Sequence, residues 1–307
     1  MIKRITALIV ITLIVLIAST INVVGGTHGG KINVFVSISP QAYFVNRIGG
    51  PHVETTVLVP PGRDMHTFEP TPRMMADLAK ARLFFTLGIP FEKTFMRKAG
   101  STFRNLEIID SSRGIKRRMM SEEESEPHEH GHGEDGHKNH GGEPDPHIWL
   151  DPVRAKTIAT NIFQGLAHLD PRGREKYKRN LDALQKDLDK LNTGISQRLA
   201  PYKGKDVFVF HPAFGYFTDR YGLRQVPVEV GGKQPTARQL ARLIDRAKSA
   251  GVKVIFVQPQ FSERSADAVA SAIGGVVVRV DPLAYAYLKN LKDMADKMAK
   301  ALGRSEN

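Results

Sequence analysis

Three histidines and one aspartate occupy positions where a metal site could be built: His66, His147, His211 and Asp281. The 307-residue chain contains eleven histidines and no cysteine. A metal site must therefore be built from imidazole nitrogens and carboxylate oxygens, and neither disulfides nor thiolate ligands are available. Three neutral imidazoles and one carboxylate suit the tetrahedral coordination of Zn²⁺. We therefore take these four residues as the candidate ligands of one metal ion.

The remaining histidines divide into two groups by their surroundings. We interpret three of them as structural or solvated residues, because they lie in a glycine-rich leader, a turn and a helix end: His28, His52 and His168. The other five lie in one acidic segment and are candidates for a secondary, low-affinity metal site: His128, His130, His132, His137 and His140.

The four candidate ligands follow predicted strands or begin an ordered segment. His66 lies in the loop 60–72 after a predicted strand, His211 directly follows the run 207–210, and Asp281 follows the run 276–280. His147 begins the ordered stretch after the acidic segment. Loops after strands are where α/β folds gather ligands. Because two candidates fall in each half of the chain, a cleft between two lobes could collect all four.

Alternating strand-like and helix-like runs predict an α/β fold with parallel sheets flanked by helices. We expect an N-terminal lobe over 31–170, a linking helix over 171–200 and a C-terminal lobe over 201–307. In the linking segment, apolar residues recur every three or four positions from Tyr177 to Leu199. This stripe predicts one helix of nearly thirty residues. Two shorter helices packed as a hairpin are the alternative.

Residues 121–146 interrupt this alternation with a low-complexity segment rich in His, Glu and Gly. It carries nine acidic residues and one lysine. Such a composition cannot bury a core. One interpretation is a collector or sensor of metal, and the other is a solvated linker.

The N-terminus predicts export from the cytoplasm. A basic head, Lys3 and Arg4, precedes an almost wholly apolar run over 5–18 and then small residues up to about residue 26, which is the order of a signal peptide. Extending the run to Val24 gives roughly 20 residues, long enough for an uncleaved membrane anchor. Without cysteine, a lipid-modified N-terminal Cys is excluded. We expect an extracytoplasmic protein, either free or tethered.

Outside the acidic segment the chain is strongly basic. The whole chain has a net charge of +12, and removing 121–146 leaves 43 basic and 23 acidic residues, a net charge of +20. Export argues against a nucleic-acid partner. Attraction to an anionic membrane surface and a solvated basic surface without a partner are both open.

Sequence motifs around the candidate ligands resemble those of one family. They are PPGRDMHTFEPTP at 60–72, DPHIWLDP at 145–152, FHPAFGYF at 210–217, VQPQF at 257–261 and VDPL at 280–283. In this order they resemble the zinc/manganese solute-binding proteins of ABC transporters, the cluster A-I or ZnuA-like family, over residues 31–302. The acidic histidine-rich segment also resembles a feature of zinc members.

This resemblance implies two α/β lobes joined by a long rigid helix, with metal held between them by His66, His147, His211 and Asp281. It implies capture of a divalent metal and delivery to an ABC-transporter permease, and we expect a monomer. His211 stands where manganese members tend to have a carboxylate, which favours Zn²⁺ over Mn²⁺. Many relatives have Glu where Gln258 stands, so we expect Gln258 to be a supporting residue.

Two other functions are compatible with such a site. A zinc metalloenzyme would keep one coordination position open for water and need a nearby general base. Four protein ligands would close the site, and the chain has no His-Glu-x-x-His motif. A metal-dependent surface adhesin is the second alternative, although no feature of the chain supports it separately.

Overall fold

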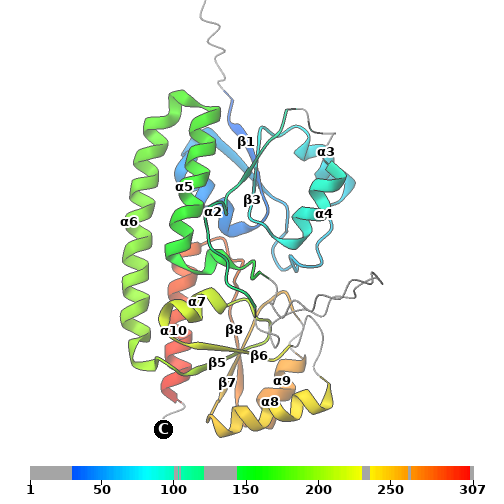
Figure 1. Cartoon of the computed structure of the whole chain (residues 1–307), viewed down its shortest axis with the longest axis vertical. Helices are drawn as coiled ribbons and strands as arrows, with labels where there is room; N and C mark the ends of the chain where they lie inside the picture. The colour runs from blue at the N-terminus through cyan, green and yellow to red at the C-terminus, as the bar shows by residue number, and fades with distance from the viewer. Residues whose placement is uncertain are drawn as a thin grey trace, which may run out of the picture. The chain divides into compact units, whose positions relative to one another are not determined.

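Two four-stranded parallel sheets with the same strand order organise the chain (Figure 1). The computed structural model describes residues 30–99, 103, 105–120, 144–229, 236–261 and 264–304. The predicted export segment 1–26 and the five histidines of the acidic segment lie outside these ranges. Residues 32–307 form one compact unit.

The first sheet has the order β2-β1-β3-β4. Its strands are β1 (Ile32–Val36), β2 (Val53–Val57), β3 (Leu83–Thr86) and β4 (Glu107–Asp110), and its helices include α2 (Ser39–Gly49), α3 (Pro72–Leu78) and α4 (Pro90–Ala99). All four residues of β3, Leu-Phe-Phe-Thr, are buried, because helices cover both faces of a parallel sheet. On one face Phe95 of α4 packs edge-on against Phe84 at 5.7 Å.

The second sheet repeats this order as β6-β5-β7-β8. Its elements are β5 (Asp206–Val209), β6 (Arg224–Pro227), β7 (Val254–Val257), β8 (Val276–Arg279), α7 (Gly215–Tyr221), α8 (Ala237–Ser249) and α9 (Arg264–Ala272). Alternate residues of β5 serve two cores, because successive side chains point to opposite faces. Val207 and Val209 join the larger core, whereas Phe208 joins the core under α8 and α9.

Two long helices, α5 (Pro152–Leu169) and α6 (Arg174–Leu199), connect the two sheets, and a third, α10 (Tyr287–Arg304), follows β8. Helix α6 packs against α2, α5 and α10. It has 26 residues, about 39 Å at 1.5 Å per residue. The predicted single helix is therefore confirmed, and the hairpin alternative is wrong. One continuous core runs from β1 to α10 along the buried stripe of α6. Such a closely packed core resists movement of one sheet relative to the other.

Helix α5 begins where the sequence provides a cap. Asp151 precedes Pro152 and accepts a hydrogen bond from the backbone N–H of Val153 at 2.9 Å, which satisfies an otherwise unpaired helix donor. Farther along α5, a Cβ at Gly165 would lie 2.5 Å from Ile109 Cδ1. Glycine therefore lets α5 approach the first sheet closely.

The predicted fold class is confirmed: two parallel sheets flanked by helices, with a long connecting helix. The predicted boundaries differ from the observed ones by a few residues at several ends, where turns and caps follow the regular elements. In the described part of the chain, none of the helices has the length and apolar character needed to cross a bilayer. The division into lobes at residues 170 and 201 stays a prediction.

Candidate metal site

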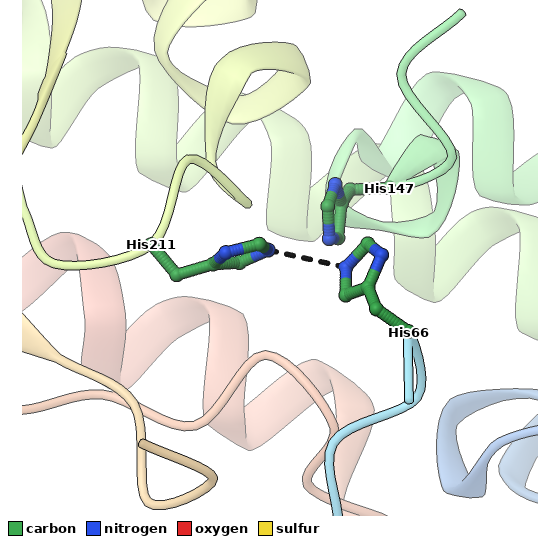
Figure 2. Close-up of side chains that lie close together, drawn as sticks. All are labelled: His66, His147 and His211. Carbon is green, nitrogen blue, oxygen red and sulfur yellow. Dashed lines mark hydrogen bonds between the residues drawn. The ribbon is translucent and has the colours of Figure 1, made fainter. Parts of the chain in front are cut away.

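Three of the four predicted ligands converge (Figure 2). Ligand nitrogens of His66, His147 and His211 all lie within 4.8 Å of one another. The Nε2 atoms of His66 and His211 are 3.1 Å apart. The three residues come from distant parts of the chain, so this arrangement depends on the complete fold.

His147 is held by a buried carboxylate two residues earlier. The carboxylate oxygen Oδ1 of Asp145 lies 2.8 Å from His147 Nδ1 and accepts a hydrogen bond from the His147 backbone N–H at 2.9 Å. Arg118 pairs with the other oxygen, Oδ2, at 2.8 Å. Burial alone would raise the pKa of Asp145, but the hydrogen bonds from His147 and Arg118 outweigh burial and hold this pKa below its usual value. Asp145 is therefore ionised at neutral pH.

His211 is fixed from three sides just after β5. Its Nδ1 lies 3.1 Å from Glu229 Oε1, and its ring stacks on Phe261 at 4.7 Å. The Gln258 amide accepts from the His211 backbone N–H at 3.2 Å and donates to its carbonyl at 2.7 Å. Gln258 thus orients the backbone of His211, which agrees with the supporting role expected for it.

His66 is carried by the loop after β2. Its backbone N–H donates to Asp64 Oδ1 at 2.9 Å, an Asx-type contact that fixes the local turn. Burial, followed by the neighbouring His211 and His147, lowers the pKa of His66 well below its usual value. Burial likewise lowers the pKa of His211 to about 3. Both imidazoles are therefore neutral at physiological pH, as a metal ligand must be.

The carboxylate of Asp145 also determines which nitrogen of His147 can bind metal. An ionised carboxylate only accepts hydrogen bonds, so Nδ1 of His147 must carry the proton. A metal can then bind this ring only through Nε2. Partners of this kind fix the tautomer and raise the basicity of a metal-binding histidine.

A cavity of about 20 Å³ adjoins the three histidines. That volume holds one water molecule or ion and is far below the size of pockets that bind organic ligands. Its lining consists of Asp64, Met65, His66, His147, Trp149, His211, Ala213, Gln260, Phe261, Pro282 and Leu283.

Asp281, the fourth predicted ligand, is not part of the histidine cluster. Its Oδ1 accepts hydrogen bonds from Gln260 Nε2 at 2.8 Å and from the Leu283 backbone N–H at 2.9 Å. Its partner Gln260 lines the cavity, whereas Asp281 is not among the lining residues. Direct coordination by Asp281 stays a prediction.

Hydrogen bonds tie the segment of His147 to the second half of the chain. Trp149 Nε1 donates to the Pro282 carbonyl at 2.8 Å, and the Tyr287 hydroxyl donates to the Trp149 carbonyl at 2.6 Å. The Tyr216 hydroxyl donates to the Asp145 carbonyl at 3.0 Å. The segment that carries His147 is thus fixed to the second half of the chain.

The acidic segment begins and ends beside the site. Met119 and Pro144 form an isolated antiparallel bridge, and the Asp145 backbone N–H donates to the Arg118 carbonyl at 3.0 Å. The two ends of the segment therefore meet next to the carboxylate that orients His147. The secondary metal role of the segment's five histidines stays a prediction.

Sequence reasoning missed Asp145 and Glu229 as supporting carboxylates. Asp145 could have been noticed, because it stands two residues before a candidate ligand. Glu229 follows β6, and only the pairing of β6 with β5 brings it beside His211. That pairing is a tertiary feature without a local sequence signal.

The sequence matches a known protein family over most of its length. A profile of the family described as zinc-uptake complex component A, periplasmic (ZnuA), matches residues 34–301. The chain belongs to the ZnuA family. The family description names an uptake component rather than a catalyst, which decides against the metalloenzyme alternative.

Two named relatives illustrate the ZnuA family match. The high-affinity zinc uptake system protein ZnuA of Bacillus subtilis (strain 168) is 31% identical over 255 residues, covering 81% of this chain and 77% of that protein. The zinc-binding protein AdcA of Streptococcus pyogenes (serotype M3) is 28% identical over 264 residues, covering 83% of this chain. The alignment spans 51% of AdcA's own length.

Solved structures show the same fold. A ZnuA crystal structure superposes with a TM-score of 0.80 at 38% identity, covering 89% of this chain and all (100%) of that chain. A zinc-bound ZnuA lacking its residues 138–173 gives a TM-score of 0.78 at 38% identity, with 89% and 98% coverage. The laminin-binding protein of Streptococcus agalactiae, described as bifunctional with adhesin and metal-transporting activity, gives 0.75 at 25% identity, with 89% and 100% coverage.

Proposed function

We propose that this ZnuA-family protein captures Zn²⁺ outside the cytoplasmic membrane and delivers it to the permease of an ABC transporter. The observation that carries the proposal is the cluster of His66, His147 and His211 beside a cavity with room for one ion. At least two of these rings are neutral by burial, and two are oriented by carboxylates. Neutral, oriented rings favour metal binding, and a bound ion would replace the contact between His66 Nε2 and His211 Nε2.

The ligand types favour zinc over manganese. Three imidazole nitrogens suit Zn²⁺, whereas Mn²⁺ prefers carboxylate and carbonyl oxygens. The carboxylates of Asp145 and Glu229 lie at the Nδ1 atoms of His147 and His211, on the opposite side of each ring from Nε2. A third carboxylate, Asp64, also lines the cavity, where its Oδ1 accepts a hydrogen bond from the His66 backbone N–H. The names of the relatives, a zinc uptake protein and a zinc-binding protein, support the same choice.

The site is suited to holding an ion as cargo. Each histidine is anchored by backbone or carboxylate contacts, and the cavity leaves no room for an organic substrate beside the ion. Delivery to a permease and a location outside the cytoplasmic membrane are supported by the predicted export segment and by the family description, which names a periplasmic uptake component.

The acidic segment supports a collecting role within this proposal. Its two ends meet at the bridge between Met119 and Pro144, close to His147. Both points at which the segment joins the described chain thus lie near His147. Ordering such a segment costs about 1–2 kcal/mol per fixed residue, so we expect it to bind metal more weakly than the main site.

Competition titration of Zn²⁺ against a chelator tests the proposal. His66→Ala, His147→Ala and His211→Ala should each weaken binding by more than about 100-fold, because loss of a supporting partner alone costs 10–100-fold. His168→Ala, an exposed histidine on α5, is the matched control and should bind like the parent. Parent-like affinity in two of the three site variants would show that the ligand set is wrong.

A further inference from the structure

Gln260 presents a buried oxygen without a partner. Its side-chain Oε1 is shielded from solvent and has no hydrogen-bond donor, and it is the one such side-chain atom among the described residues. Leaving a buried polar group unpaired costs about 1–3 kcal/mol. Such an atom in a native fold requires an explanation, and an absent ion or water is a common one.

Asp281 fixes the direction in which this amide points. Gln260 Nε2 donates to Asp281 Oδ1 at 2.8 Å. The same oxygen accepts from the Leu283 backbone N–H at 2.9 Å, and Asn290 holds the Asp281 carbonyl at 2.7 Å. Because a carboxylate offers only acceptors, the Gln260 amide must direct its NH₂ group to Asp281. Its carbonyl oxygen therefore points away from the Asp281 carboxylate.

Gln260 lines the cavity that the three histidines line. Three imidazole nitrogens leave one position of a tetrahedral Zn²⁺ shell to be filled. The cavity has room for a single small species. The carbonyl oxygen of a residue that lines such a cavity can accept a hydrogen bond from a water molecule in the fourth position.

We propose that Gln260 is the residue that determines what fills the fourth coordination position. Its Oε1 accepts a hydrogen bond from the water bound to the metal, and Asp281 acts through the Gln260 amide rather than as a ligand. This inference rests on the proposed capture of Zn²⁺ by the three histidines. A fixed neutral acceptor favours a proton-bearing ligand, water, and opposes an anion, which would bring a second lone pair towards the carbonyl oxygen.

Gln260→Met tests the proposal, because methionine keeps the length of the side chain and removes the amide. Gln164→Met, an exposed position on α5, is the control. We expect Gln260→Met to bind one Zn²⁺ with 10–100-fold lower affinity. In Co²⁺-loaded protein the visible absorption bands should shift, and added azide should change them further in Gln260→Met but not in the parent. Parent-like affinity and an unchanged Co²⁺ spectrum would overturn the proposal.

A double-mutant cycle separates Gln260 from Asp281. If Asp281 acts through the amide, Asp281→Ala should cost no more affinity than Gln260→Met, and the double variant should match Gln260→Met. A larger loss for Asp281→Ala overturns the proposal in favour of direct coordination by Asp281. If the proposed function is wrong, the result differs: His211→Ala would bind Zn²⁺ as tightly as the parent. That result would overturn both the capture of Zn²⁺ by the three histidines and the role of Gln260. Thermal unfolding of metal-free protein confirms that each variant is folded.

Discussion

Replacing Asp145 by asparagine should weaken zinc binding without removing any metal ligand. In the parent, the Asp145 carboxylate binds His147 twice, at the Nδ1 atom and at the backbone N–H, and it pairs with Arg118. Asparagine keeps the shape of the side chain but removes its charge. The NH₂ group of the asparagine must then face either His147 or the Arg118 guanidinium. Because both of these groups are donors, one of the parent's contacts cannot form.

The expected size of the effect follows from these contacts. Loss of a partner that orients a metal-binding histidine costs 10–100-fold in metal affinity. Each factor of ten corresponds to about 1.4 kcal/mol, so the predicted loss is about 1.4–2.8 kcal/mol. Asp145 is completely buried and has no water to replace the lost charge, which places the expectation in the upper half of this range.

Asp219→Asn is the matched control for Asp145→Asn. Asp219 also pairs with Arg118, at 3.1 Å, but its side chain is 60% exposed, and Asp219 does not line the cavity. Chelator competition at pH 7.5 measures both variants. We expect the control to bind within about threefold of the parent, since exposed ion pairs contribute little. Equal affinity of Asp145→Asn and the parent would refute the claim that this carboxylate prepares His147 for metal.

Three further predictions concern metal choice, the acidic segment and pH. His211→Glu should lower the ratio of Zn²⁺ to Mn²⁺ affinity, because a carboxylate suits Mn²⁺ better; an unchanged ratio of the two dissociation constants would contradict this. Deleting 121–143, which keeps the bridge at Met119 and Pro144, should reduce zinc uptake in calorimetry from several equivalents to one tight equivalent. The pKa of His211 in the folded protein is about 3, which lies below its unfolded value near 6.5. The contribution of His211 to the free energy of unfolding is therefore complete above pH 6.5. Below pH 6.5 this contribution falls by up to about 1.4 kcal/mol per pH unit. Urea unfolding of metal-free parent and His211→Gln at pH 7.5 and 5 should show this difference, and parallel curves would contradict it.

The pH comparison must be made between variants, because a second buried group acts in the opposite direction. Burial raises the pKa of Glu92 to about 7, although hydrogen bonds from Ser37 and from three backbone N–H groups oppose the rise. A raised carboxyl pKa adds stability as pH falls from about 7 towards its unfolded value near 4.3. This contribution is the same in the parent and in His211→Gln, so it cancels in their difference.

Local patterns were sufficient to predict the fold class. The period of the apolar residues identified α6 as one helix. The identical order of the two sheets could not be predicted, because strand pairing depends on contacts between residues far apart in sequence. No internal repeat in the sequence indicates this similarity.

The site was predictable only in part. His66 and His211 were identifiable because each follows a strand, and His147 because it begins an ordered segment after the acidic one. Their supporting groups were not identifiable, since Glu229 reaches His211 only through the pairing of β5 and β6. Asp281 follows β8 as expected, but its backbone turn directs the carboxylate to Leu283 and Gln260. The direction of a side chain after a strand is set by local hydrogen bonds that sequence position does not reveal.

X-ray absorption at the zinc edge tests the central claim most directly. The sample is protein lacking 121–143 and loaded with one equivalent of Zn²⁺, so that the histidines of the acidic segment cannot contribute. We predict a four-coordinate shell of three imidazole nitrogens and one oxygen at about 2.0–2.1 Å, with one imidazole fewer in His211→Ala. A shell with one imidazole or none, or a shell unchanged by His211→Ala, would contradict capture of zinc by His66, His147 and His211.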